Sequence, residues 1–404
     1  MEYKNHFLII VFSCSILGTL VAVLSNDLYY EEKFKSKPII KDDLSDNKVS
    51  LINEENKNNL NNINQKDKNE IISKRNFIFD DDLEDENTES KYHTIHIALN
   101  IDNKFIYPCI VFITSLLDNR KQSTKYHIHI LTSGDFSQDN INKINTLINK
   151  FGKDFLKINF INMQNAFEDA NTSPYVSTSS YYRIRLPSLL SDIDRVLYID
   201  TDVINFADLT EMYNLELNDN IFLRGILDNI SNIVELTYFG INTKKYMNAG
   251  VLLMNLKSMR KFGIEEKLID FVNNYFLEHH DQTAINAICY NNFGILSIKY
   301  ATFCFDRFEN MVKYNNRQNK LYRYTNEELQ KAYNEPFLLH YVGWNKPWDI
   351  GCKVKYSEYW WYYAKQSDFY EQILGHYGFN NDKVEILLNN IPEDGGLLKR
   401  KFMK

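Results

Sequence analysis

Residues 195–204, RVLYIDTDVI, decide the fold class of this chain. The first part, residues 196–199, is apolar and β-prone with no polar face, which predicts a strand buried on both sides. Two carboxylates, Asp200 and Asp202, follow directly, with Thr201 between them. Hard oxygen ligands at the end of a buried strand suit Mg²⁺ or Mn²⁺, and such an ion could hold a diphosphate. The stretch therefore predicts a strand that ends in a metal site.

Strand and helix patterns alternate around this stretch, which predicts an α/β fold with a mainly parallel sheet and helices on both faces. The predicted strands are residues 93–99, 126–131, 158–161, 195–199, 221–226, 250–254 and 337–342. The predicted helices are residues 108–117, 137–151, 178–190, 264–277 and 281–290.

The D-x-D spacing occurs three times, and the position on the sheet distinguishes the three cases. Ligands of such sheets bind beyond the carboxyl ends of the strands. The pair Asp200 and Asp202 lies at that edge, whereas residues 192–194 precede the same strand and residues 80–82 lie in an acidic segment. Asn100 and Asp102 follow the first predicted strand, so we expect them at the same edge, where they could meet a base or a ribose.

A second group of polar residues occurs in residues 340–348, HYVGWNKPW. His340 ends a predicted strand and suits the nitrogen ligand of a divalent transition ion. Gly343 permits close backbone approach, and Lys346 supplies a charge for a phosphate. The alternative is a core histidine before a turn with packed tryptophans, since all four tryptophans lie between residues 344 and 361. Together with the acid pair, the site interpretation is favoured.

Four motifs in this order carry a family resemblance. The series YIDTDVI, NAGVLLMNL (residues 248–256), DQTAIN (residues 281–286) and HYVGWNKPW resembles glycosyltransferase family 8 of the GT-A fold, which includes lipooligosaccharide galactosyltransferases and glycogenins. The resemblance covers residues 94–348. It implies a Rossmann-like GT-A fold and a retaining transferase. Such an enzyme uses Mn²⁺, with Mg²⁺ as an alternative, to move a hexose or pentose from a UDP-sugar to a glycan or glycoprotein acceptor.

The same resemblance implies roles for individual residues. Asp200, Asp202 and His340 would coordinate the metal ion. Gly343 and Lys346 would contact the phosphates. The full set of expected UDP-sugar contacts is Ala98, Asn100, Asp102, Arg183, Asp200, Thr201, Asp202, Asn248, Ala249, Gly343 and Lys346.

Three residues are candidates for the reacting face of the sugar: Gln282, Asp228 and Asp281. Retention requires either a double displacement or attack from the side of the leaving group, and the sequence leaves both open. Asp281 also has an alternative role as the N-cap of an apolar helix. His279 and His280 form a rival metal cluster, which is disfavoured because adjacent residues on a helix point in different directions.

The remaining composition limits the function classes and the location. The chain has 404 residues and a net charge of −7 without a long basic stripe, which argues against nucleic-acid binding. Its five cysteines show no C-x-x-C spacing, so neither a zinc site nor a disulfide scaffold is indicated.

The N-terminal part of the chain differs from the rest. Residues 7–24 contain no charge, which predicts a transmembrane signal anchor within residues 1–25, with a cleaved signal peptide as the alternative. Residues 26–91 are rich in Asn, Asp and Lys and predict a disordered stem. We expect a type II protein of the Golgi or ER membrane, with a lumenal catalytic domain at residues 92–365 and a helical, basic tail at residues 366–404. A homodimer is left open.

Two other function classes compete with an active transferase. A catalytically inactive scaffold that binds a sugar or nucleotide would share the fold, but such a scaffold usually loses one member of the acid pair, His340 or Lys346. A metal-dependent nucleotidyltransferase would share acids at strand ends, but it leaves HYVGWNKPW unexplained.

Overall fold

The computed structural model describes residues 94–398, apart from residues 165, 168–169, 171–177, 229–232, 306, 318–322, 353 and 394. The predicted membrane anchor at residues 1–25 and the predicted stem at residues 26–91 lie outside the described residues. Within the described ranges, no helix combines the length and the apolar character needed to cross a bilayer.

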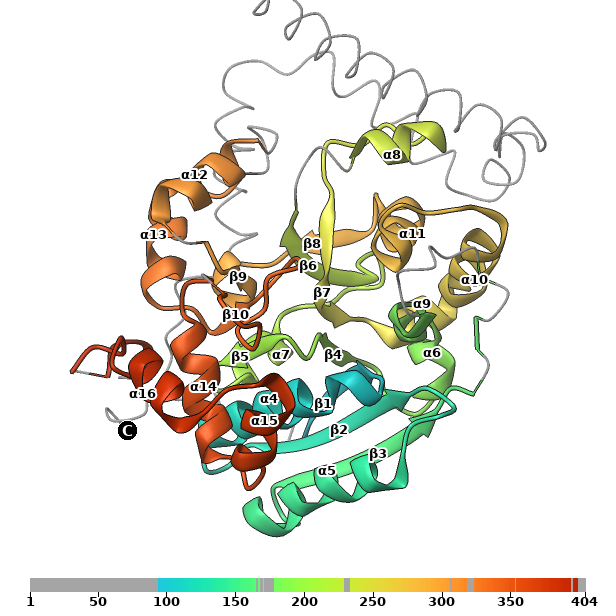
Figure 1. Cartoon of the computed structure of the whole chain (residues 1–404). Coiled ribbons are helices and arrows are strands. Elements are labelled where there is room, and N and C mark those ends of the chain that lie inside the picture. The colour runs from blue at the N-terminus through green and yellow to red at the C-terminus, as the bar shows by residue number, and fades with distance from the viewer. Residues whose placement is uncertain are drawn as a thin grey trace, which may run out of the picture. The chain divides into compact units, whose positions relative to one another are not determined.

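A seven-stranded sheet forms the centre of the described unit (Figure 1). Its strands are β1 Thr94–Ile101, β2 Lys125–Thr132, β3 Leu156–Asn162, β4 Val196–Ile199, β6 Leu223–Leu227, β7 Met247–Met254 and β8 Phe293–Ile295, in the order β3-β2-β1-β4-β7-β6-β8. The first four strands in this order are parallel. β7 runs antiparallel to both β4 and β6, and β6 is parallel to β8. The prediction of a mainly parallel α/β fold is confirmed, with one reversed strand near the centre.

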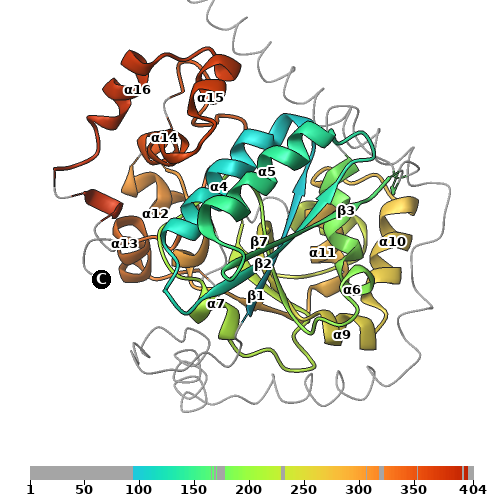
Figure 2. The same ribbon diagram turned by 90° about the horizontal axis from the view of Figure 1, so that it is seen from below.

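One face of β1 and β2 is covered by two helices (Figure 2). α4, Ile106–Asp118, is buried along nearly its whole length. Its Pro108 lies in the first turn, where a missing N–H leaves no intrahelical bond unmade. α5, Gln138–Phe151, begins after Ser137, whose side chain accepts a hydrogen bond from the backbone N–H of Asn140. Both helices confirm the sequence prediction, including the serine cap.

The opposite face is covered by η2 Thr178–Arg185, α6 Leu186–Leu189, α9 Leu256–Lys261, α10 Ile264–Asn274 and α11 His280–Cys289. The prediction of a single helix over residues 178–190 is wrong, because the chain forms the 3₁₀ helix η2 and then the single turn α6. In a continuous α-helix, the ring of Pro187 would clash with the carbonyl of Arg183 and remove a hydrogen bond. The helix therefore restarts, with Pro187 in the first turn of α6.

A second, three-stranded sheet joins distant parts of the sequence. It contains β5 Val203–Asn205, β9 Thr302–Phe303 and β10 Leu338–His340, in the order β5-β10-β9. β10 is antiparallel to β5 and parallel to β9. Since β5 follows β4 after three residues, this small sheet brings the end of β10 to the carboxyl end of β4.

The remaining elements complete the described unit. They are η1 Asn103–Phe105, α7 Thr210–Asn214, α8 Ile233–Tyr238, η4 Ile298–Ala301, α12 Phe308–Asn316, α13 Asn326–Asn334, α14 Ser357–Gln366, α15 Tyr370–Tyr377, α16 Asn381–Leu388 and η5 Gly396–Leu398. α14 packs against α4 (Figure 2). Its Trp360 and Trp361 are fully buried. The predicted helical tail contributes Ile373, Leu374 and Val384 to the same core.

Candidate active site

Two acids stand at the carboxyl end of β4, as its sequence predicts. All four residues of β4 are buried. The backbone N–H of Asp200 donates to the carbonyl of Gly250 at 2.7 Å, and the carbonyl of Asp202 accepts from the N–H of Tyr341 at 3.0 Å. The first bond ties Asp200 to β7, and the second ties Asp202 to the residue after β10. The backbone around the acid pair is therefore fixed from both sides.

The small sheet brings His340 to this acid pair. His340 lies opposite Val203 in the antiparallel pairing of β10 with β5. Its Nε2 lies 3.2 Å from Asp202 Oδ1 and 4.0 Å from Asp200 Oδ2. One ligand atom from each of the three residues lies within 4.8 Å of the others. The residues that the sequence predicts as metal ligands thus converge across 138 positions of sequence (340 − 202).

The chemistry and space of this cluster fit a divalent ion. Asp202 Oδ1 is buried and lacks a hydrogen-bond donor of good geometry. A Cβ at position 250 would lie 2.3 Å from His340 Cε1 and 2.7 Å from Asp200 Oδ2, so only glycine leaves room for these side chains. Two carboxylates and one imidazole form a mixed oxygen and nitrogen set that suits Mn²⁺ and also accepts Mg²⁺.

Lys346 neutralises part of the charge of the acid pair. Its Nζ lies 2.6 Å from Asp202 Oδ2 and donates to the carbonyl of Tyr341 at 2.7 Å. Burial would raise the pKa of Asp202, but the charges of Lys346 and His340 outweigh it and hold that pKa below its usual value. Asp202 is therefore an ionised, buried carboxylate.

Arg183 on η2 links the acid pair to α11. The guanidinium is 6% exposed and lies 3.1 Å from Asp200 Oδ1 and 3.1 Å from Asp281 Oδ2. It also donates to the carbonyl of Ala249 and packs 4.0 Å from the centre of the Tyr198 ring, whose hydroxyl donates to Asp200 at 2.7 Å. Burial raises the pKa of Asp281 to about 6, although Arg183 opposes that shift. One cation thus organises two carboxylates.

A second polar network lies at the start of β7. Asp228 Oδ2 accepts from Asn248 Nδ2 at 2.8 Å and from Gln282 Nε2 at 3.1 Å, and Asp228 Oδ1 accepts from the Tyr314 hydroxyl. Gln282 Oε1 accepts from the backbone N–H of Ala249 at 3.1 Å. Because β7 is antiparallel to β4, its leading residues lie at the carboxyl edge of the parallel strands, beside Asp200. The three predicted residues Asp228, Asn248 and Gln282 are therefore in mutual contact.

Asn286 is a supporting residue to which the sequence analysis gave no role. Its side chain accepts from the N–H of Met247 at 2.7 Å and donates to the Met247 carbonyl at 2.7 Å. These two hydrogen bonds attach the first residue of β7 to α11. Asn286 is fully buried. The available signal was its spacing of four residues from Gln282, which places both side chains on the same face of a helix. Tyr314 is a further residue of the network that no sequence motif indicates.

Asp281 lies inside the first turn of α11, and His279 is the N-cap residue. The proposed N-cap role of Asp281 is therefore wrong. His279 Nδ1 lies 3.2 Å from Glu235, whereas the ring of His280 makes an edge contact with that of Tyr181, so the two adjacent histidines diverge, as predicted.

The residues predicted to bind the base and ribose lie around the end of β1. Ala98 is fully buried in the core. Asn100 donates to the carbonyl of Ser179 at 2.9 Å, and its Oδ1 is buried without a hydrogen-bond partner. Asp102 caps η1 by accepting from the N–H of Lys104 at 2.9 Å. Asp102 thus has a structural role that the sequence analysis did not assign.

Thr201 and Gly343 are two further predicted contacts. Thr201 is 4% exposed between the two acids. Gly343, in the turn after β10, has a φ of +85°, a conformation that favours glycine.

Comparison with known proteins places this geometry in a family. A family model described as glycosyl transferase family 8 matches residues 96–351. General stress protein A of Bacillus subtilis is 28% identical over 285 residues, which cover 68% of this chain and 94% of that protein. Glycosyltransferase GlyE of Streptococcus pneumoniae is 26% identical over 241 residues, 59% of this chain and 54% of that protein, so the match spans about half of that relative.

Among solved structures, galactosyltransferase LgtC in complex with donor and acceptor sugar analogs matches with a TM-score of 0.57 and 22% identity. The match covers 68% of this chain and 96% of that one. It shows a shared fold.

Proposed function

We infer the reaction from one premise: this chain belongs to glycosyl transferase family 8, whose model matches well over half of it, and is a glycosyltransferase. We propose that it moves a hexose or pentose from a UDP-sugar to a glycan or glycoprotein acceptor with retention of configuration, and that the reaction depends on Mn²⁺. The observation that carries the proposal is the convergence of Asp200, Asp202 and His340 beside the network of Asp228 and Gln282.

Three residues of the site would hold the metal ion, and Lys346 would contact the diphosphate. Asp200, Asp202 and His340 would hold the metal ion, and a bound divalent ion stabilises the negative charge that builds on a departing diphosphate. Lys346 contacts Asp202 Oδ2, whereas Asp202 Oδ1 lies near His340 and has no hydrogen-bond partner. Oδ1 would therefore be the ligand atom, and Lys346 would stay beside the metal site, where its ammonium group could also contact a phosphate. Arg183 would keep Asp200 oriented.

The second network favours attack from the side of the leaving group over a double displacement. Asp228 accepts hydrogen bonds from Tyr314, Asn248 and Gln282, and a carboxylate with three donors is a weakened nucleophile. The carbonyl oxygen of Gln282 is also occupied, by the N–H of Ala249. We propose that Asp228 steadies the cation-like sugar through its fixed charge and forms no covalent bond.

The acceptor would approach over the turn that follows β10. Trp344 in this turn is 90% exposed and stands two residues before Lys346. The other three tryptophans are buried or nearly so. An exposed indole face beside a diphosphate site suits packing against the apolar face of a sugar ring, which supports a glycan acceptor.

The test of the donor proposal is a panel of UDP-sugars, read by hydrolysis and by thermal shift in Mn²⁺. We expect one UDP-sugar to be hydrolysed by the wild-type chain, with the activity lost in excess EDTA. Asp202→Asn should lower turnover by at least ~10³-fold, because it removes a ligand charge at the site of charge development. The matched control is Asp192→Asn, which changes the D-x-D pair at the other end of β4.

Full activity of Asp202→Asn, or of the wild-type chain in excess EDTA, would remove the metal assignment. Binding of a UDP-sugar without any turnover would favour the inactive scaffold. Equal losses in Asp192→Asn and Asp202→Asn would indicate a general defect of folding.

We also propose that residues 7–24 anchor the full chain in an ER or Golgi membrane, with the catalytic domain in the lumen. This proposal rests on the uncharged run of residues 7–24. Carbonate extraction and protease protection of the full chain test it, with a chain that starts after residue 25 as the control. Release of the full chain by carbonate would contradict it.

A further inference from the structure

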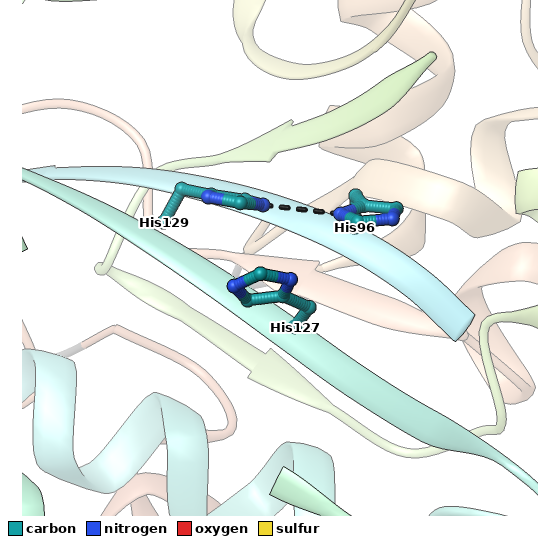
Figure 3. A group of neighbouring side chains, drawn as sticks. All are labelled: His96, His127 and His129. Atoms are coloured by element: carbon teal, nitrogen blue, oxygen red, sulfur yellow. Dashed lines mark hydrogen bonds between the residues drawn. The ribbon is translucent and has the colours of Figure 1, made fainter. Parts of the chain in front are cut away.

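Three histidines gather on the sheet away from the acid cluster (Figure 3). His96 lies on β1, and His127 and His129 lie on β2. His96 is directly opposite His127 in the parallel pairing, and alternate residues of a strand share a face, so all three side chains project from the same side. One ring nitrogen from each histidine lies within 4.8 Å of the others, and His96 Nδ1 is 3.1 Å from His129 Nε2.

This histidine cluster is separate from the candidate active site. His96 precedes Asn100 by four residues, which corresponds to about 13 Å along an extended strand. The acid cluster lies beyond the carboxyl ends of the strands, whereas His127 lies near the amino end of β2. No residue of the histidine cluster has a role in the proposed transfer reaction.

The three rings are held neutral, which is the form that binds metal ions. Burial lowers the pKa of His96 to about 4 and that of His129 to about 3, and it also lowers the pKa of His127. The charge of Lys157, opposite His127 on β3, adds to these shifts. No proton therefore has to leave an imidazolium at neutral pH for a metal ion to bind.

One ring nitrogen of the cluster, His127 Nε2, is buried and lacks a hydrogen-bond partner. The other two ligand atoms would be His96 Nδ1 and His129 Nε2, whose mutual hydrogen bond an ion would replace. Metal-binding histidines present lone pairs at about 2.0–2.1 Å from Zn²⁺, so two ligands of a tetrahedral ion are separated by about 3.3 Å. The 3.1 Å between His96 Nδ1 and His129 Nε2 is close to that value.

We propose that His96, His127 and His129 form a second metal site, which takes Zn²⁺ or a similar borderline transition ion. Three imidazoles without a carboxylate favour such an ion over Mg²⁺ and Mn²⁺, which prefer oxygen ligands. His96 and His127 are only partly buried, so water can fill the fourth position. The ion would join β1 to β2 and act as a structural clamp, with no part in the transfer step.

The test uses the full chain carrying Asp202→Asn, which disables the acid cluster, after removal of bound metal with a chelator. We expect one equivalent of Zn²⁺ to bind in excess Mg²⁺, and Co²⁺ to give the intense visible absorption of tetrahedral nitrogen coordination. His127→Gln should weaken Zn²⁺ by more than the roughly 10- to 100-fold that loss of an outer-shell partner costs. The matched control is His376→Gln, a change of an exposed histidine on α15 that should leave binding intact.

Two further readouts separate a metal site from a general effect on the fold. Lys157→Gln removes a positive charge beside the cluster, so it should tighten Zn²⁺ a few-fold at low salt. In the otherwise wild-type chain, His127→Gln should keep its turnover in Mn²⁺ but lose the rise in Tm that Zn²⁺ produces. Absence of a bound equivalent in the Asp202→Asn chain, or equal affinity with and without His127→Gln, would overturn the proposal.

Discussion

The acid cluster and the histidine cluster contain three residues each, and they are built in opposite ways. The acid cluster of Asp200, Asp202 and His340 is assembled from β4 and β10 and is surrounded by the fixed charges of Arg183 and Lys346. The histidine cluster comes from the neighbouring strands β1 and β2, is kept neutral by burial and contains one hydrogen bond between its own members. A site that must respond to a charged leaving group carries charges, whereas a site that only binds an ion can remain neutral.

The largest expected effect comes from filling the space in the acid cluster. Gly250→Ala places a Cβ against His340 Cε1 and Asp200 Oδ2, at 2.3 and 2.7 Å, so one ligand must move. Because displacements of about 1 Å can cost ~10²-fold in rate, we expect turnover to fall by ~10²- to 10³-fold, with weaker Mn²⁺ binding. Steady-state kinetics over a series of Mn²⁺ concentrations measures both effects.

The control for this change is Gly375→Ala in α15, where an added Cβ meets nothing within 4 Å. Gly375→Ala should keep full activity and the same Tm or a slightly higher one. Wild-type kinetics in Gly250→Ala would show that turnover does not depend on the positions of His340 and Asp200 beside Gly250.

The next largest effect is expected at Arg183, whose guanidinium group contacts the carboxylates of both Asp200 and Asp281. Lysine cannot reproduce the two separate contacts of Arg183 with Asp200 and Asp281, so Arg183→Lys should lower kcat/KM by ~10- to 100-fold. The matched control is Arg185→Lys, since Arg185 pairs with Glu265 at 2.9 Å and is 43% exposed. Equal kinetics of the two variants would argue against an organising role of Arg183.

The sequence was sufficient to predict that Asp200, Asp202 and His340 lie together. It did not predict that β7 runs antiparallel to β4. The buried run before Asp200 and Asp202 predicts their edge of the sheet, and the strand before His340 predicts a third ligand. Strand direction depends on how the chain returns after β6, which no local pattern reports. The reversed β7 is what places Asn248 beside Asp228.

Other features of the site also depend on tertiary contacts. Gly250 is needed because two side chains approach it from other strands, and Tyr314 reaches Asp228 from α12. For the histidine cluster a local signal did exist, since a His-x-His spacing on a strand puts both rings on one face. Only the register of β1 against β2 adds His96 to that pair.

A smaller effect concerns pH and the histidine cluster. In the metal-free chain, the pKa values of His96 and His129 in the folded state lie below the unfolded value of about 6.5. As the pH falls below 6.5, the unfolded state therefore binds more protons than the folded state, and the free energy of unfolding decreases. The two neutral histidines make their full contribution to the free energy of unfolding above pH 6.5, and this contribution is lost as the pH falls toward about 4. We expect a loss on the order of 1–3 kcal/mol at pH 5, allowing for the solvent that reaches His96.

Urea unfolding in EDTA at several pH values measures how steeply the free energy of unfolding decreases as the pH falls. His127→Gln, combined with His96→Gln, should flatten it, whereas His376→Gln should leave it unchanged. A slope that is identical in all three chains would contradict the neutral character of the cluster.

The smallest effect concerns a single hydroxyl of the acid cluster. Tyr198→Phe removes the hydrogen bond to Asp200, which is worth about 1 kcal/mol, so we expect a roughly fivefold loss of turnover. Tyr213→Phe is the control, because its hydroxyl bonds to the Arg195 carbonyl at the other end of β4. Tyr213→Phe should lower Tm but leave the kinetics unchanged.

The position of β10 has a consequence for protein synthesis. Asp200 and Asp202 leave the ribosome long before His340, and β5 finds its partner only when residues 338–340 have emerged. At ~5–20 residues per second, the 138 residues from Val203 to His340 take roughly 7–30 seconds to translate. During this interval the nascent chain carries two of the three proposed ligands. Binding of an ion by all three residues would therefore have to follow the emergence of His340.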